Sequence, residues 1–322
     1  MKKQAFTLIR HAADVLMLPI TILCSIWINL VIKRSLVTMP LTEFIFLHFG
    51  FLPVRDHYYQ PLINPRRHLK LPLETERVLP GIDLTVSYQL DLLAKFNYAD
   101  ELSSFPLTQG PPLSYHYNNG AFESGDSEYL YNIIRHYKPK RMIEIGSGHS
   151  TKMAVNAVKQ NQRENSGYSC EHSCIEPYEM PWLEQTSVNV IRKKVEDVEL
   201  SLFKSLEEGD ILFIDSSHII RPQGDVLTEY LEILPVLKQG VLIHIHDIFT
   251  PRDYLKEWIF DDHRLWNEQY LLEAFLSFNK DFRVIGAVNY LKHHHFTELA
   301  SKCPILAQQP HREPGSFWIQ RV

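Results

Sequence analysis

Short apolar runs alternate with segments of helical periodicity through the second half of the chain. The first run, 141–145, ends at a glycine turn and is followed by a helix, as a buried parallel strand does before a crossover. Further strands are predicted at 173–175, 188–191, 211–214, 241–245, 283–288 and 316–320, with helices at 126–136, 228–237 and 265–278. Strands that alternate with helices indicate an α/β fold with a doubly wound, mostly parallel sheet.

The N-terminal segment has a different pattern. Residues 15–32 form an apolar run of eighteen residues without charge, which is the lower limit for crossing a bilayer, and Pro19 interrupts it. Three interpretations stay open: a spanning anchor, a helix in the membrane interface, or a helix buried against the rest of the chain. Basic residues flank both ends, so charge does not choose an orientation. No small-residue cleavage site follows, which disfavours a removable signal peptide.

Residues 41–125 are rich in proline, histidine and aromatic residues, which predicts irregular backbone with one helix at 87–96. We therefore divide the chain into an N-terminal apolar helix at 1–40, an irregular and helical cap region at 41–125, and an α/β domain at 126–322. The first two parts form an N-terminal extension to the sheet.

Composition narrows the class of protein. A hydrophobic content of 45% predicts a packed core, and a formal net charge of -5 provides no basic surface for nucleic acid. Four cysteines are too few for a disulfide scaffold and favour a reducing, cytoplasmic environment. Cys170, His172 and Cys174 suggest a metal clip, but no second ligand pair with zinc spacing follows, so we interpret them as the start of a strand.

The glycine turn after the first strand indicates a ligand-binding site. Gly146 and Gly148 permit positive φ and a close approach of backbone to ligand, and Ser150 or Thr151 can cap the helix that follows. Thr151 stands where a dinucleotide fingerprint has its third glycine, which disfavours a nicotinamide cofactor. Glu144, near the end of a buried strand, needs a cationic or donor-rich partner.

Acids and histidines stand at the ends of four predicted strands, namely Glu144, Glu176, Asp215 and the pair His246–Asp247. In open α/β sheets, ligands bind outside the carboxyl ends of the strands, where the strand order reverses. The four positions therefore predict one polar rim that faces a ligand.

The E-x-G-x-G form of 144–148 resembles the first motif of class I S-adenosylmethionine-dependent methyltransferases, and FIDSSH at 213–218 resembles the FIDxxH element of an O-methylating group. This resemblance implies a seven-stranded sheet with a final antiparallel pair and S-adenosylmethionine as the cofactor. It implies that Glu176 binds the ribose hydroxyls. The full set of cofactor-binding residues that it implies is Glu144, Gly146, Ser147, Gly148, Ser150, Thr151, Glu176 and Asp215.

Two ways of activating an acceptor hydroxyl stay open. By resemblance to catechol-type O-methyltransferases, Asp215 and Asp247 would hold Mg²⁺, which lowers the pKa of the hydroxyl. Ile248 departs from that group, which has Asn after the second aspartate. Without a metal, a histidine takes the proton, and His218 and His246 are stronger candidates than His244. The predicted catalytic residues are His218, His246 and Asp215.

We predict a methyltransferase that acts on a hydroxyl oxygen of a small molecule or glycan, with no nucleic-acid partner, in the cytoplasm and attached to the inner face of a membrane through residues 15–32. Two alternatives are a metal-dependent oxygenase on the same fold, as in cephalosporin-hydroxylase-like relatives, and a membrane-tethered binding module without turnover. Trp266 and Tyr270, predicted on one helical face, either stack on the acceptor or pack in the core. His293 to His295 are interpreted as a solvated turn.

Overall fold

The computed structural model describes residues 2–57, 59–178 and 180–322, with side chains from Phe6 onward. Contacts between residues divide the chain after Lys70 into two compact units. Residues 71–125, which we predicted as part of a cap region, therefore belong to the same unit as the sheet.

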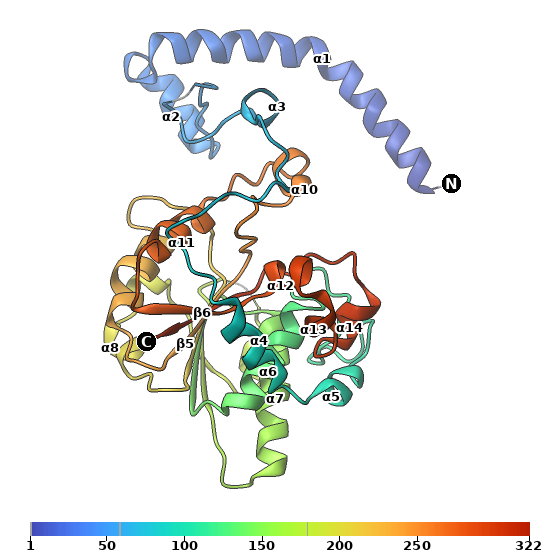
Figure 1. Ribbon diagram of the computed structural model, residues 1–322. Helices are drawn as coiled ribbons and strands as arrows, with labels where there is room; N and C mark the ends of the chain where they lie inside the picture. The colour runs from blue at the N-terminus through green and yellow to red at the C-terminus, as the bar shows by residue number, and fades with distance from the viewer. Residues whose placement is uncertain (1, 58, 179) are drawn as a thin grey trace. The chain divides into compact units, whose positions relative to one another are not determined.

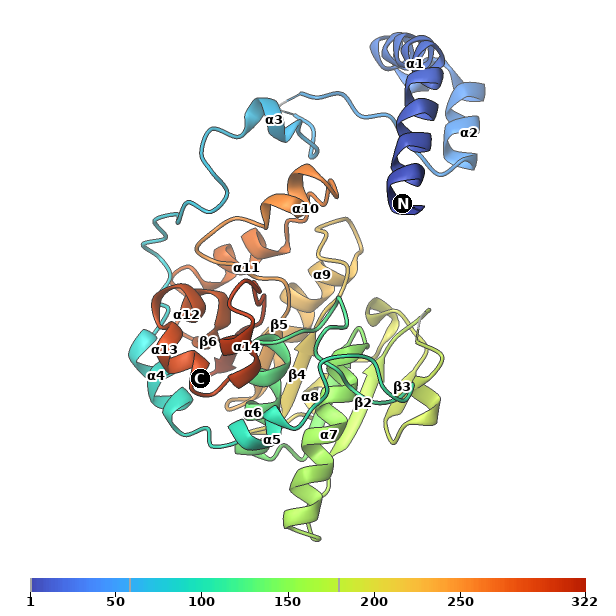
Figure 2. The ribbon, with the colours of Figure 1, turned by 90° about the vertical axis from the view of Figure 1, so that its right-hand side faces the viewer.

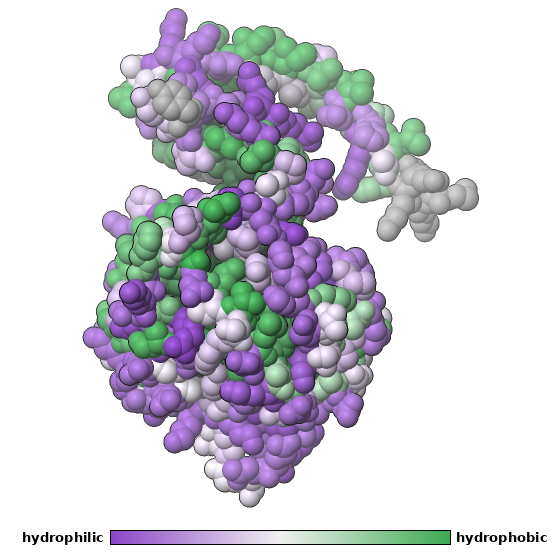
Figure 3. All heavy atoms as spheres, viewed as in Figure 1, coloured by the Kyte–Doolittle hydropathy of each residue, from purple (hydrophilic) through white to green (hydrophobic). Residues whose placement is uncertain are grey.

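The first unit consists of α1 (Lys2–Arg34), a short 3₁₀ turn (Leu36–Thr38), α2 (Pro40–His48) and α3 (Pro65–His68). Within the described residues, Phe6–Arg34 is the one helical stretch long and apolar enough to cross a bilayer, and only 6% of its most apolar window is buried. Apolar side chains form much of its surface, with hydrophilic ones toward its N-terminal end (Figure 3). The hydroxyls of Thr21 and Ser25 donate to carbonyls one turn back, so these polar groups are satisfied within the helix. Pro19 lies inside α1, and Figure 1 shows the helix bent along its length.

The second unit is built on a seven-stranded sheet in the order β3-β2-β1-β4-β5-β7-β6. Six strands run in the same direction, and β7 runs antiparallel to both of its neighbours. The strands are β1 (Arg141–Ile145), β2 (Glu171–Ile175), β3 (Asn189–Ile191), β4 (Ile211–Ile214), β5 (Leu242–Ile245), β6 (Phe282–Ala287) and β7 (Phe317–Arg321). The predicted doubly wound sheet and its final antiparallel pair are confirmed.

Helices cover both faces of this sheet, which is seen nearly edge-on in Figure 1. One face packs against α4 (Val86–Ala94), α6 (Asp126–Tyr137) and α7 (His149–Glu164). The short helices α5 (Ala99–Ser103), α12 (Val288–His294), α13 (Phe296–Ala300) and α14 (Pro304–Gln308) lie on the same side (Figure 2). The other face packs against α8 (Leu200–Lys204), α9 (Asp225–Thr228) and α11 (Glu268–Leu276). A smaller apolar cluster surrounds α10 (Lys256–Phe260). Successive strand residues point alternately into the two main apolar clusters, because both faces of the sheet are buried.

Three details of the predicted elements were wrong. The helix at 228–237 is split into α9, a π-helical turn (Glu229–Ile233) and a 3₁₀ turn (Leu234–Val236), and Pro235 cannot donate the hydrogen bond that would continue a helix. Because α11 begins at Glu268, Trp266 precedes it and shares no helical face with Tyr270.

The third wrong detail is the histidine run. His293 and His294 belong to α12 instead of a solvated turn. Their Nε2 atoms lie 2.8 Å from Glu313 and 2.7 Å from Glu76, so carboxylates of other segments hold them in place. Sequence periodicity carries no information about such distant partners.

Candidate functional site

Two strand ends bring the predicted polar side chains together. Asp215 and His218 follow β4, and His246 and Asp247 follow β5, its parallel neighbour. His218 and Asp247 have φ values of 60° and 58°. Left-handed backbone is costly for residues other than glycine and concentrates at functional sites, and here both left-handed residues carry side chains of the cluster.

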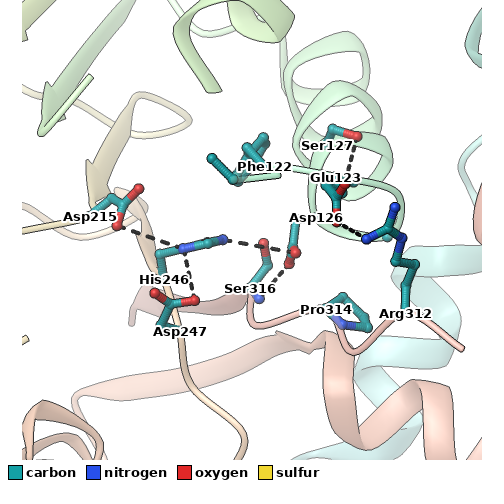
Figure 4. Close-up of polar contacts among 12 residues, drawn as sticks. Phe122, Glu123, Asp126, Ser127, Asp215, His246, Asp247, Arg312, Pro314 and Ser316 are labelled. Carbon is teal, nitrogen blue, oxygen red and sulfur yellow. Dashed lines mark hydrogen bonds and ion pairs between the residues drawn. The ribbon is translucent and has the colours of Figure 1, made fainter. Parts of the chain in front are cut away.

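His246 is the centre of the cluster in Figure 4. Its Nδ1 lies 3.2 Å from Asp247 Oδ1 and 3.7 Å from Asp215 Oδ1. On the other side of the ring, Nε2 is 3.9 Å from Asp126 Oδ2, and it has no hydrogen-bond partner among the described residues. The Phe122 ring lies against the imidazole, with centroids 5.2 Å apart. One nitrogen of His246 is therefore held while the other is left for a ligand.

His218 has no such unoccupied nitrogen. Its Nδ1 bonds Glu268 Oε2 at 2.8 Å, and its Nε2 lies 3.3 Å from Asp215 and 3.4 Å from Asp247. Trp266 packs on the ring at 4.4 Å between centroids. His218 thus links two strand ends to the start of α11.

The carboxylates determine the charge of both imidazoles. Burial acts to lower the pKa of His246, but the charges of Asp247 and Asp215 outweigh it, and the pKa lies well above its usual value. Burial likewise acts to lower the pKa of His218, and its hydrogen bonds to Asp215 and Glu268 raise that pKa well above the usual value.

A cavity of about 580 Å³ opens beside His246 and Asp247. Asp126 also lines it, with Oδ1 accepting the Ser316 N–H at 2.7 Å, an arrangement visible in Figure 4. Aromatic and basic groups form much of the remaining wall, namely Phe249, Arg252, Tyr254, Lys256, Trp258 and Arg312. The cavity therefore offers apolar ring faces together with charged hydrogen-bonding groups.

The glycine turn lies at the same edge of the sheet. Gly146 has φ 76°, and a Cβ there would stand 1.9 Å from the carbonyl oxygen of Asp215, so only glycine fits against β4. A Cβ on Gly148 would meet nothing within 4 Å, which leaves room for a ligand against the backbone. Glu176 accepts the Ser147 N–H at 3.4 Å and so lies at the turn. This open glycine and the adjacent carboxylate fit S-adenosylmethionine, whose ribose offers hydroxyl donors and whose sulfonium is positive.

Other predicted cofactor residues lie beneath the turn. Glu144 and Thr151 are fully buried and Ser150 nearly so. Thr151 Oγ1 donates to Glu144 Oε2 at 2.5 Å and accepts the Gly148 N–H at 3.2 Å. Gly148 is the N-cap of α7, so the prediction of Ser150 or Thr151 as the cap was wrong, and Thr151 in the first turn instead accepts the N–H of Gly148.

The rim also contains residues that sequence reasoning did not select. Asp126 was predicted only as the first residue of the helix at 126–136, and Glu268 and Phe122 were not considered for the rim. A signal for Glu268 existed, because it lies in the run from Trp266 to Tyr270 that follows the fifth strand. His244 is fully buried and stacks on Phe213 at 3.9 Å between centroids, so it packs in the core.

One group of ligand atoms at the rim has the spacing of a metal site. A carboxylate oxygen from each of Asp215 and Asp247 and one nitrogen of His246 all lie within 4.8 Å of one another. Carboxylate oxygens are the ligands that Mg²⁺ prefers. The side chains present therefore fit a divalent cation.

Comparisons with known proteins agree with the fold and the turn. Residues 143–248 match a family model described as "Methyltransferase domain". An uncharacterised protein of Archaeoglobus fulgidus is 34% identical over 167 residues, which is 48% of this chain and 74% of that protein.

Two solved structures are weakly similar. One, described as cmcI with Mg and SAM, is 14% identical over 62% of this chain and 72% of its own, with a TM-score of 0.36. The other, an O-methyltransferase from Bacillus cereus in complex with SAH, is 15% identical over 76% of this chain and 93% of its own, with a TM-score of 0.33. Scores at this level do not by themselves carry a functional argument.

The sheet order, the glycine turn and the family match agree with the class I methyltransferase fold. Residues 143–248 match its methyltransferase domain, and the glycine turn fits S-adenosylmethionine as the cofactor.

Proposed function

We propose that the chain transfers the cofactor's methyl group to a hydroxyl oxygen of a small molecule or glycan that binds in the cavity. The placement of His246 carries this proposal. Its Nδ1 is held by Asp247, while its buried Nε2 has no hydrogen bond among the described residues and belongs to a side chain that lines the cavity. A buried polar atom in this state is costly unless a ligand satisfies it.

In the proposed reaction, the acceptor oxygen forms a bond to the methyl carbon, the carbon–sulfur bond breaks, and the hydroxyl proton leaves. Alignment of oxygen, methyl and sulfur supplies much of the acceleration. His246 Nε2 receives the proton in this scheme. We assign His218 a positioning role, because both of its nitrogens face carboxylates.

In an alternative scheme, Asp215, Asp247 and His246 would hold a Mg²⁺ ion, and His246 would then be a ligand and not the base. Such an ion supplies positive charge that lowers the pKa of an acceptor hydroxyl. The two aspartates would then neutralise the ion instead of holding a proton on His246. His218, which touches both aspartates, would fix their orientation.

The cavity wall supports a polar ring as the acceptor. Trp258 and Tyr254 provide aromatic surface, and Arg252 and Arg312 provide hydrogen-bond donors. Arg312 is paired with Glu123, which fixes its position at the cavity (Figure 4). A sugar or hydroxylated aromatic ring combines an apolar face with edge hydroxyls and matches such a wall.

The test combines calorimetry with a screen of acceptors. Titration with S-adenosylmethionine and S-adenosylhomocysteine, with and without Mg²⁺, measures cofactor binding, and a panel of sugars and phenols measures methyl transfer. In His246→Gln we expect kcat to fall by about 10²-fold to 10⁴-fold, the usual worth of a general base, with cofactor affinity unchanged.

The control for that variant is His263→Gln, which changes an exposed histidine outside the cavity and should leave kcat unchanged. A kcat of His246→Gln equal to that of the wild type would contradict the proposed proton transfer. Oxygen consumption without a methylated product would instead favour an oxygenase.

We also propose that α1 attaches the chain to a membrane. A helix of 29 residues is about 43 Å long, which exceeds the roughly 30 Å of a bilayer core. Large apolar side chains remain exposed along it, among them Leu16, Leu23, Ile26 and Trp27. Contiguous exposed apolar surface of this kind marks an interaction with lipid or protein.

Vesicle flotation tests the attachment. The full chain should float with phosphatidylcholine and phosphatidylglycerol vesicles and resist alkaline carbonate extraction, whereas Leu23→Lys/Ile26→Lys should remain in the soluble fraction. The matched control, Leu231→Lys/Phe278→Lys, changes exposed apolar residues of the second unit and should float. Removal of the helix from the mature chain, seen by mass spectrometry, would contradict the anchor.

A further inference from the structure

Glu144, His172 and Cys174 form a second cluster of ligand side chains, separate from the rim. Glu144 on β1 and Cys174 on β2 are paired in register, and His172 is two residues before Cys174, on the same face. The exposed fractions are 0%, 6% and 0% for Glu144, His172 and Cys174. Three side chains with metal-ligating atoms therefore converge in a closed space beneath the glycine turn.

The distances among their ligand atoms are those of a coordination triangle. Cys174 Sγ lies 3.2 Å from Glu144 Oε2 and 3.7 Å from His172 Nε2, and His172 Nε2 lies 3.2 Å from Glu144 Oε2. A tetrahedral zinc ion with bonds of about 2.3 Å to sulfur and 2.0 Å to nitrogen and oxygen places its ligand atoms roughly 3.3 to 3.6 Å apart. The side chains match this geometry without rearrangement.

Hydrogen bonding alone explains the cluster poorly. Thr151, Cys174 and His172 all approach Glu144 Oε2, whereas Oε1 of the same buried carboxylate has no partner within the described part of the chain. A carboxylate oxygen has two lone pairs, so three donors on one oxygen and none on the other is an unbalanced arrangement. A bound cation would remove the imbalance, because sulfur, nitrogen and oxygen would all direct lone pairs at it.

We propose that Glu144, His172 and Cys174 bind one zinc-class transition-metal ion in a closed structural site. On binding, the Cys174 S–H bond breaks, a sulfur–metal bond forms, and the proton goes to solvent. One thiolate and one carboxylate then neutralise the double positive charge, with neutral His172 as the third ligand. The second carboxylate oxygen, Glu144 Oε1, has no hydrogen-bond partner among the described residues and is available to the same ion.

The donor set separates this site from the rim. Thiolate and imidazole ligands select zinc and its softer neighbours, whereas the two aspartates at the rim suit Mg²⁺. Because its ligands come from two adjacent strands, the ion would tie β1 to β2 below the turn that receives the cofactor. From the sequence we interpreted Cys170, His172 and Cys174 as the start of a strand and not as a metal clip; in the structure Glu144 takes the place of Cys170, which lies outside the cluster.

The test measures metal content and ligand identity in the full chain. Protein expressed in zinc-supplemented medium should contain about one zinc per chain by inductively coupled plasma mass spectrometry. Cobalt-substituted protein should show a thiolate-to-cobalt charge-transfer band. Both signals should be lost in Cys174→Ser and His172→Gln. They should persist in Cys170→Ser, the neighbouring cysteine, and in Asp247→Asn at the rim.

Zinc below a tenth of an equivalent in folded wild-type protein would overturn the proposal. So would a charge-transfer band that survives Cys174→Ser, or zinc that is lost in Asp247→Asn alone. If Cys174→Ser does not fold, X-ray absorption at the zinc edge of the wild-type protein tests whether a sulfur atom ligates the ion. One sulfur neighbour near 2.3 Å supports the site, and a shell of only nitrogen and oxygen refutes it.

Discussion

The two histidines of the rim differ because different residues contact them. His218 and His246 follow neighbouring strands and were equivalent as sequence candidates, but only His246 keeps a ring nitrogen without a partner in the described residues. The differences come from Glu268 and Asp126, which are separated in sequence from the histidines they meet by 50 and 120 positions (268 - 218 and 246 - 126). The local sequence predicts that acids and histidines form the rim. Contacts with residues distant in sequence decide what each histidine does.

His149, the first residue of α7, provides a residue-scale prediction. Burial, with the positive charge of Lys152 and the neighbouring His116, lowers its pKa to about 4. Its folded pKa is below the unfolded value of about 6.5, so its contribution to stability is complete above that pH and is lost as pH falls toward 4. Proton NMR should show the His149 ring neutral at pH 6, with a midpoint that rises in Lys152→Gln. A midpoint near 6.5 in the wild type would contradict this account.

Glu128, fully buried in α6, provides a second residue-scale prediction. Its two carboxylate oxygens accept the N–H groups of Gly125, Ile305 and Leu306. Glu128→Gln replaces one acceptor oxygen by an amide donor that faces another donor, so we expect a loss of about 1–3 kcal/mol in the free energy of unfolding. Urea denaturation measures it. Glu298→Gln, at an exposed position, is the control and should change stability by less than about 0.5 kcal/mol.

At the scale of elements, the turn between β1 and α7 was the most predictable part of the chain. Apolar strand residues and two glycines agree on one local structure, and such agreement makes sequence reasoning reliable. Elements without that agreement were less predictable. The segment after β4 contains a π-helical turn and Pro235, and Trp266 falls outside α11, because tertiary contacts outweigh periodicity there.

The two glycines of the turn should respond differently to alanine. Gly146→Ala places a Cβ against the Asp215 carbonyl in left-handed backbone, so it should lower the melting temperature and cofactor affinity together. Gly148→Ala meets open space, so the melting temperature should hold while the affinity for S-adenosylhomocysteine falls. Thermal unfolding and calorimetry separate the two effects. Equal loss of stability in both variants would show that the space beside Gly148 is not reserved for a ligand.

At the scale of the whole molecule, the seven strands and their alternation with helices followed from apolar periodicity, whereas the division of the chain did not. Proline-rich residues 71–125 resemble a linker in composition, yet Arg77 pairs with Glu273 and Gln89 Oε1 accepts the N–H of Ala287. These contacts join the segment to the sheet. A composition shift therefore marked a change of local structure and not the boundary between compact units.

The division after Lys70 predicts where a protease cuts. Arg66, Arg67 and Lys70 are exposed, so trypsin should cleave there first and release a stable fragment that begins at Leu71. Mass spectrometry identifies the cut, and circular dichroism of the fragment should show a cooperative thermal transition. First cleavage within 126–322 would be inconsistent with a compact second unit.

The position of β7 has a consequence for biosynthesis. This strand, seventh in chain order, lies between β5 and β6, which are not paired with each other. While a ribosome still holds residues 317–321, β5 has one unpaired side and β6 has no strand partner, so both are open to pairing with other nascent chains. The sheet therefore closes only after translation has delivered β7.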